Sequence, residues 1–179
     1  HTGALRNDGG VWSWGWSSLG QSGAGETKTR STPVKVSGID SITSISAGAA
    51  HNLALKADGT VWSWGHNGQG GLGDGSTDDR QTPIQVTGAT GGKALAAGLY
   101  HSLALKSDGT VVAWGSNSNG QLADASGAPV RRSPAPVAGL SGVSAIAASY
   151  NASHALKSDG TIYAWGDLGA SGNLYAPVP

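Results

Sequence analysis

The five histidines are the side chains of this chain best suited to metal binding or to proton transfer near neutral pH. Three of them, His1, His51 and His101, recur at intervals of about fifty residues, a pattern that could supply the ligands of a metal cluster. The matching position further along holds Ala152, and each of the three histidines belongs to a different repeat. We therefore expect these imidazoles to make structural hydrogen bonds at the starts of strands, and we predict no metal site.

Nucleophilic catalysis would need a Ser, Thr or Cys beside a His and an acid, at a place where the repeats differ. The chain contains no Cys, and only His66 and His154 lie outside the recurring series. Neither has a convincing nucleophile or acid partner in the sequence. We therefore predict that the protein is not an enzyme.

Two loop sequences resemble ligand-binding motifs. Residues 68–73 match the G-x-G-x-x-G pattern that holds a pyrophosphate, but the helix pattern that a dinucleotide site requires does not follow them. Residues 74–79 carry side-chain oxygens at alternate positions, yet Gln85 stands where an EF-hand loop would end in an acid. We predict a solvated loop here, and no cofactor.

A repeating architecture must position these residues, because one hairpin-like sequence occurs four times in register. The four copies are residues 1–15, 51–65, 101–115 and 152–166. Each reads as a strand, an Asp-Gly pair and a second strand that ends in Trp-Gly. Asp-Gly between two β-rich runs is a strong hairpin signal, because a type I′ turn needs positive φ at both central residues. The sequence therefore predicts four β-hairpins.

Two further strand sequences accompany the hairpins. One contains Pro33, Pro83 or Pro134, and Pro favours the edge of a sheet because it lacks the N–H that a central strand donates. The other alternates small and apolar residues, which suits the crowded centre of a ring. These inner sequences are residues 42–48, 94–98 and 143–148. Four strands per repeat favour the blade of a β-propeller, with a solenoid as the alternative.

The expected fold is therefore all-β, with about 15 strands in about four blades, forming one partial propeller over residues 1–179. The predicted repeats are residues 1–50, 51–101, 102–151 and 152–179. One Trp recurs in every copy, as a core position should, and we assign it to packing between blades. These residues are Trp14, Trp64, Trp114 and Trp165.

The repeat resembles that of the regulator of chromosome condensation family, in its bacterial form. The resemblance is carried by residues 97–105, Ala-Gly-Leu-Tyr-His-Ser-Leu-Ala-Leu, and by residues 114–122, Trp-Gly-Ser-Asn-Ser-Asn-Gly-Gln-Leu. Residues 142–150 are also similar to the blades of a bacterial propeller-type β-lactamase inhibitor. The resemblance implies a ring of about seven blades, of which this chain supplies about half.

A half-ring would leave two apolar blade faces open to water, and large apolar patches of that kind normally mark interfaces. We therefore expect either self-association through these faces or a fragment of a longer protein. The chain has no Met, so His1 is not expected to be a native translation start.

Information about a specific partner should lie where the repeats differ. The residues before the hairpins differ most, and they include Leu99, Tyr100, Tyr150 and Asn151, while Trp16 is a non-repeating aromatic in a long loop. Tyr and Trp are typical anchors of protein interfaces. We predict a protein–protein interaction module that presents these residues on one rim.

Two other functions stay open. The family resemblance implies nucleotide exchange on a small GTPase, but Ala49, Leu99 and Tyr150 stand where an acid would be wanted. Trp16 and its polar neighbours suggest glycan binding as the other alternative. Balanced charge, with eleven basic and eleven acidic residues, argues against nucleic acid, and the sequence has no membrane-spanning stretch. Low charge and the absence of Cys lean towards a secreted or cell-surface bacterial protein.

Overall fold

The computed structural model describes residues 1–169 and 172–179 and contains 15 strands in four antiparallel sheets. The first sheet holds β1 (Thr2–Leu5), β2 (Val11–Gly15) and β3 (Arg30–Lys35). The second holds β4 (Ile42–Ala47), β5 (His51–Lys56), β6 (Val61–Gly65) and β7 (Arg80–Gln85). The third holds β8 (Gly92–Ala97), β9 (His101–Lys106), β10 (Val111–Ser116) and β11 (Val130–Pro136). The fourth holds β12 (Val143–Ser149), β13 (Ala152–Lys157), β14 (Ile162–Asp167) and β15 (Asn173–Val178).

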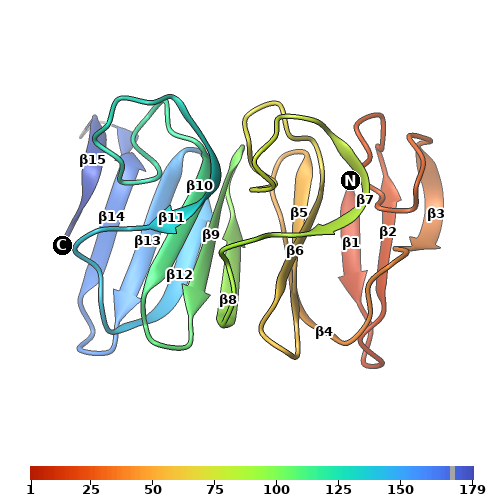
Figure 1. The fold of residues 1–179 in the computed structure, drawn as a ribbon, viewed down its shortest axis with the longest axis horizontal. Helices are drawn as coiled ribbons and strands as arrows, with labels where there is room; N and C mark the ends of the chain where they lie inside the picture. Colours follow the sequence, from red (N-terminus) through yellow and green to blue (C-terminus); the bar gives the residue numbers. More distant parts are fainter. Residues whose placement is uncertain (170–171) are drawn as a thin grey trace.

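The four sheets stand side by side in chain order as the blades of an open ring, which confirms the all-β partial propeller (Figure 1). In the second, third and fourth blades the inner strand comes first in the chain and the Pro-containing strand lies at the opposite edge, as the sequence predicts. Each of these blades therefore takes its inner strand from the end of the repeat counted before it. The first blade has three described strands, and β1 is its innermost one.

The Asp-Gly turns form tight hairpins at one end of the blades, the lower end in Figure 1. Gly59 has a φ of 79°, and the Asp58 carboxylate accepts hydrogen bonds from the N–H and hydroxyl of Thr60 at 2.9 and 2.6 Å. These bonds to the charged form lower the pKa of Asp58. The short side chain of Asp thus closes the turn, while Gly59 supplies the left-handed backbone. Asp58 does not have a positive φ, so the expectation of a type I′ turn with positive φ at both central residues is wrong, although the hairpin itself forms.

The Trp-Gly pair that ends each hairpin marks an irregularity in the sheet. The pairing of β6 with β7 shifts register between Ser63 and Gly65, and Gly65 has a φ of 101°. A Cβ at Gly65 would lie 2.6 Å from the carbonyl oxygen of Ala50, so a side chain there would clash with backbone. The glycine is therefore required by both conformation and space.

The core lies between the blades. Three apolar clusters occupy the three spaces between adjacent sheets, and each contains one of the recurring Trp side chains. Trp64, Trp114 and Trp165 are at most 1% exposed. Trp14 is only half-buried, because it lies on the face of the first blade that no other described blade covers. The packing role predicted for all four Trp residues is thus seen in three of them.

A recurring polar contact, which we call the interblade joint, links each blade to the next. A backbone carbonyl in the loop of one blade accepts two hydrogen bonds from the following blade. In the joint between the second and third blades, Gly71 O accepts from Trp114 Nε1 and from Ser102 Oγ, both at 2.8 Å. His51 Nε2 lies 3.0 Å from the same Ser102 Oγ. The expected structural role of the recurring histidines is confirmed.

The other two interblade joints repeat this arrangement. Gln21 O accepts from Trp64 and Asn52, with His1 beside Asn52, and Gln121 O accepts from Trp165 and Ser153, with His101 beside Ser153. Burial lowers the pKa of His51 to about 3 and that of His101 to about 4, because the charged imidazolium would lose its hydration. Both histidines are therefore neutral in the folded protein at neutral pH.

Candidate protein-binding rim

The non-repeating residues gather at the end of the blades opposite the Asp-Gly hairpins, the upper end in Figure 1, which we call the loop end. It consists of the short turns at residues 48–50, 98–100 and 150–151 and the long loops at residues 16–29, 66–79 and 117–129. The short turns and the long loops lie at the same end because the strands are antiparallel: β5 begins at the end of the blade where β6 finishes, and β9 begins where β10 finishes. Every residue predicted to bind a partner lies at this end.

The short turns are joined to one another around the inside of the ring. Ala49 N donates to Leu99 O at 3.3 Å, and Leu99 N donates to Tyr150 O at 2.7 Å. These residues and their neighbours line an open hollow of about 210 Å³. The lining residues are Ala47, Gly48, Ala49, Ala97, Gly98, Leu99 and Tyr150. Small side chains and hydrogen-bonded backbone thus form a fixed depression with Tyr150 at its border.

Tyr150 is the most exposed of the large hydrophobic residues, at 68%. Its φ of 49° lies in the left-handed region, which is unusual for a residue with a bulky side chain. In the other two turns the preceding residue is Gly48 or Gly98, whereas here it is Ser149. The turn of the fourth blade therefore has its own conformation, and such strain is often found at functional positions.

Tyr100 lies elsewhere on the rim, because it occupies the second position of its turn while Tyr150 occupies the first. Its ring packs edge-on against the imidazole of His66, with centroids 5.9 Å apart and an interplanar angle of 73°. Asp79 Oδ1 lies 3.0 Å from His66 Nδ1 and also accepts a hydrogen bond from Asn67 N at 2.7 Å. The two tyrosines predicted to act together are thus separate features of the loop end.

Sequence reasoning missed the contact between His66 and Tyr100. The repeat pattern marks His66 only as a histidine outside the recurring series, and His66 comes from a different blade than Tyr100. One signal was available: the residue after each Trp-Gly differs in every repeat, as Trp16, His66, Ser116 and Asp167. Trp16, at the position equivalent to His66, is 50% exposed.

Asn151 has a different role from that of its exposed neighbour Tyr150. Its side chain is half-buried, and its Oδ1 accepts a hydrogen bond from Gln121 Nε2 at 3.4 Å. Gln121 belongs to the loop of the preceding blade, whose carbonyl forms the last interblade joint. Asn151 therefore fastens the turn that carries Tyr150 to the neighbouring blade.

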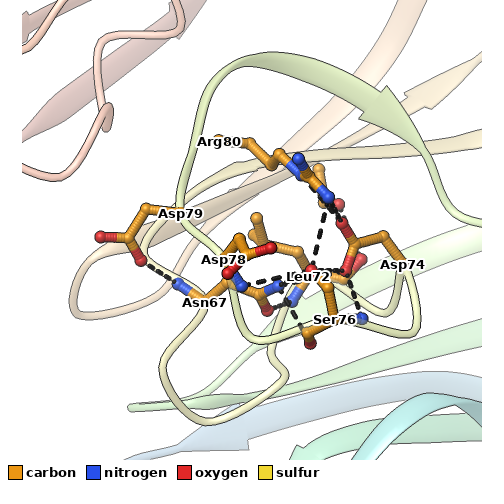
Figure 2. A network of polar contacts seen from close by, with 8 residues as sticks. Asn67, Leu72, Asp74, Ser76, Asp78, Asp79 and Arg80 are labelled. Carbon is orange, nitrogen blue, oxygen red and sulfur yellow. Dashed lines mark hydrogen bonds and ion pairs between the residues drawn. The ribbon is translucent and has the colours of Figure 1, made fainter.

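The long loops are held by internal polar networks, as Figure 2 shows for the second blade. Asn67 Oδ1 accepts from Leu72 N at 3.0 Å, while its Nδ2 donates to Asp74 Oδ1 at 3.1 Å and to Ser76 O at 3.2 Å. Arg80 closes the network through two bonds to Asp74 Oδ2, at 2.9 and 2.6 Å. The loop is therefore a rigid base for the rim.

The charge of Asp74 is already satisfied within the loop. Burial alone would raise the pKa of its carboxyl, but hydrogen bonds from Ser76 and the Arg80 guanidinium outweigh burial and lower the pKa. The third blade repeats the pattern, with Asp124 paired to Arg131. Among residues 1–169 and 172–179, no group of three or more His, Asp or Glu side chains is placed to hold a metal ion. Over the same residues, no helix is long and apolar enough to cross a membrane.

The described blades and their varied loop end define a β-propeller scaffold of internal repeats. A family model for the regulator of chromosome condensation (RCC1) repeat matches residues 8–55, 58–105 and 108–156. A second model of the same repeat matches residues 42–70 and 93–121. The chain therefore belongs to the RCC1 repeat family. A search of curated protein sequences found no match.

Several solved structures share this fold. Human WBSCR16 superposes with a TM-score of 0.86 at 23% identity, over 98% of this chain and 48% of its own. Yeast RCC1 (Prp20), solved bound to Kap60, gives a TM-score of 0.86 at 22% identity, over 98% of this chain and 45% of its own. A structure of Prp20p from Saccharomyces cerevisiae, described with its binding to Gsp1p and histones, gives 0.84 at 22% identity, covering 98% and 47%. The chain thus spans about half the length of the structures it matches.

Proposed function

We propose that the protein is a non-catalytic binding module that holds a protein partner at its loop end. Tyr150 is the central contact, with Leu99 beside it and Tyr100 and Trp16 at neighbouring positions. The partner places an apolar side chain in the hollow between the short turns, where Tyr150 packs against it.

The exposure of Tyr150 on a fixed backbone is the observation that carries this proposal. Its side chain is 68% exposed, while its carbonyl is bonded to Leu99 of the neighbouring turn. Tyr offers a large amphipathic contact and loses little conformational entropy when it is immobilised. An anchor on a backbone already held in position needs less ordering on binding, which favours affinity.

The partners of similar propellers support binding of proteins in particular. Prp20 was solved bound to Kap60, and Prp20p was described with its binding to Gsp1p and histones. Those proteins are about 22% identical to this chain, so they support the class of ligand and not a particular partner.

A site-specific photocrosslinker at position 150 tests the proposal. In the host's extract we expect it to capture a discrete protein that a crosslinker at Asn7, in a hairpin at the opposite end, does not capture. With that protein purified, Tyr150→Ala should weaken binding by about 2 kcal/mol, or roughly 30-fold. Equal capture at both positions, or unchanged affinity of the variant, would reject the loop end as the binding surface.

Nucleotide exchange is the rival function, and the loop end offers little to support it. The inner row of turn residues consists of Ala49, Leu99 and Tyr150, with no acid among them. We expect no acceleration of nucleotide release from a small GTPase. A stimulated release that is lost in Tyr150→Ala would replace simple binding by exchange.

A further inference from the structure

The long loop of the third blade and the outer strand of the fourth blade border an open cavity of about 600 Å³, which we call the Tyr175 cavity. It lies where this loop reaches towards β15, at the left of Figure 1. Its lining residues are Asn117, Ser118, Ala125, Gly127, Pro129 and Tyr175. The volume falls within the range of about 300–1,000 Å³ that is usual for small-molecule sites. None of these residues lines the hollow between the short turns, so the cavity is a separate feature.

Tyr175 forms one wall of the cavity and departs from the repeat. The residue that follows the partner of the Trp-Gly glycine is Gln81 in the second blade, Arg132 in the third and Tyr175 in the fourth. The Tyr175 ring lies so close to Gly120 that a Cβ on this glycine would be 2.9 Å from Tyr175 Cδ1. The side chain is nevertheless 44% exposed. One edge of the ring is thus held against the loop, while the rest is accessible to a ligand.

The opposite wall is held in place by hydrogen bonds within the loop. Asn117 Nδ2 donates to the carbonyl oxygens of Asp124 at 3.0 Å and of Ala128 at 3.2 Å. Asn119 Nδ2 also donates to Asn173 Oδ1 at 3.4 Å, which links the loop to the start of β15. Because its walls are already ordered, the cavity loses little conformational entropy when a ligand enters.

The loop of the third blade lacks the acids that the loop of the second blade carries at this place. In the second blade, Asn67 N donates to the Asp79 carboxylate at 2.7 Å. In the third blade, Asn117 N donates instead to the carbonyl oxygen of Pro129 at 2.8 Å. The remaining acid, Asp124, is already ion-paired. Within the described part of the chain, no residue that lines the cavity is charged, so the lining favours a neutral ligand over an ion.

The chemistry of the lining selects among neutral ligands. The face of a Tyr ring is negative and attracts polarised C–H groups. Ser118 is exposed, so its hydroxyl is accessible as a donor and an acceptor. A pyranose sugar has the complementary pattern, with C–H groups on one face and hydroxyls around its rim. We propose that the Tyr175 cavity binds a neutral pyranose unit of a glycan, with its C–H face on Tyr175 and its hydroxyls towards Ser118 and the loop backbone.

Titration with neutral methyl pyranosides, followed by NMR of the aromatic side chains, tests this proposal. The chain has four Tyr and no Phe, so the variant Tyr175→Phe identifies the resonances of the Tyr175 ring. We expect these resonances to shift progressively with at least one methyl glycoside of glucose, galactose, mannose or N-acetylglucosamine. The resonances of Tyr150, at the hollow, should stay in place. An array of neutral glycans then identifies the larger glycan that contains the preferred sugar.

Variants on both walls test the site itself. Tyr175→Ala should weaken binding of the preferred sugar by roughly 10-fold or more, because the ring is lost. Tyr175→Phe keeps the ring and should weaken it by no more than roughly 5-fold, the worth of one hydrogen bond. Ala125→Leu leaves Tyr175 intact but fills the cavity, and should weaken binding by roughly 10-fold or more. Because Ala125 is exposed, this variant should fold as the native chain does, which circular dichroism checks.

The matched controls are Tyr150→Ala and Trp16→Ala, which remove exposed aromatic rings elsewhere at the loop end and should leave the affinity for the sugar unchanged. The inference is overturned if no methyl pyranoside shifts the Tyr175 ring and no neutral glycan on the array binds. It is also overturned if Tyr175→Ala and Ala125→Leu both keep the native affinity, or if adenosine or N-acetylneuraminic acid binds more tightly than every neutral sugar. Loss of binding in Trp16→Ala but not in Tyr175→Ala would equally reject it. These results are independent of the protein partner, which crosslinking at position 150 tests separately.

Discussion

Replacement of Ser102 by Ala tests whether the interblade joint holds the blades together. The Ser102 hydroxyl donates to Gly71 O at 2.8 Å, so it is left to accept a hydrogen bond from His51 Nε2–H at 3.0 Å. His51 is 1% exposed and Ser102 is fully buried. The substitution therefore leaves the buried His51 N–H without a partner, which costs about 1 to 3 kcal/mol. It also removes the hydrogen bond from Ser102 to Gly71 O, whose net contribution is about 1 kcal/mol. We expect the free energy of unfolding to fall by about 2 to 4 kcal/mol.

Urea unfolding, followed by tryptophan fluorescence and circular dichroism, measures this loss. The matched control is Ser107→Ala, because Ser107 donates to Gly91 O at 3.2 Å from an exposed position and should cost less than about 0.5 kcal/mol. A double-mutant cycle with His51→Ala should show strong coupling, since removing the imidazole removes the unpaired group. If Ser102→Ala costs no more than Ser107→Ala, the joint does not stabilise the ring as argued.

Three further outcomes are expected. Burial depresses the pKa of His51 and His101 in the folded state to about 3 and about 4, from 6.5, so their contribution to stability is complete above pH 6.5 and is lost as the pH falls. The free energy of unfolding should therefore drop by roughly 2 to 3 kcal/mol per pH unit between about pH 6 and pH 4. An unchanged free energy of unfolding in urea titrations over this range would contradict the neutral buried pair. Gly65→Ala should lower the free energy of unfolding by more than about 2 kcal/mol, because the φ of Gly65 is 101° and the new Cβ would meet the Ala50 carbonyl. Gly38 has a positive φ but open space around it, so Gly38→Ala should cost only about 1 kcal/mol in the same assay. Trp16→Ala should leave the Tm within about 1 °C, because the side chain is 50% exposed. If the native chain binds a glycan array and this variant does not, glycan binding through Trp16 would be supported instead.

The blade architecture could be predicted because its signals are local. An Asp-Gly pair dictates a turn through backbone conformation alone, and a Pro restricts its strand to an edge through the donor it lacks. Such rules need no knowledge of neighbouring sheets. The strands, their order within a blade and the structural histidines followed from them.

The details of the rim could not be predicted because they depend on contacts between blades. Sequence comparison puts Tyr100 and Tyr150 near one another in their repeats, but a one-position difference in the turn sends Tyr100 towards His66 and Tyr150 to the hollow. The half-buried state of Trp14 likewise depends on which blade lies beside it and not on its own sequence context. Proximity between residues about fifty positions apart becomes visible only once the sheets are packed.

The interblade joint takes its acceptor from the main chain, and this has an evolutionary consequence. The residues that offer the carbonyl are Gln21, Gly71 and Gln121, and the geometry is the same for each because a peptide oxygen is present whatever the side chain. These three residues are themselves buried, but substitution of exposed residues in the same loops, such as Trp16, can alter what the surface displays while the acceptor oxygen of each joint stays in place. A lineage of such proteins could exchange one target for another while inheriting its framework unchanged.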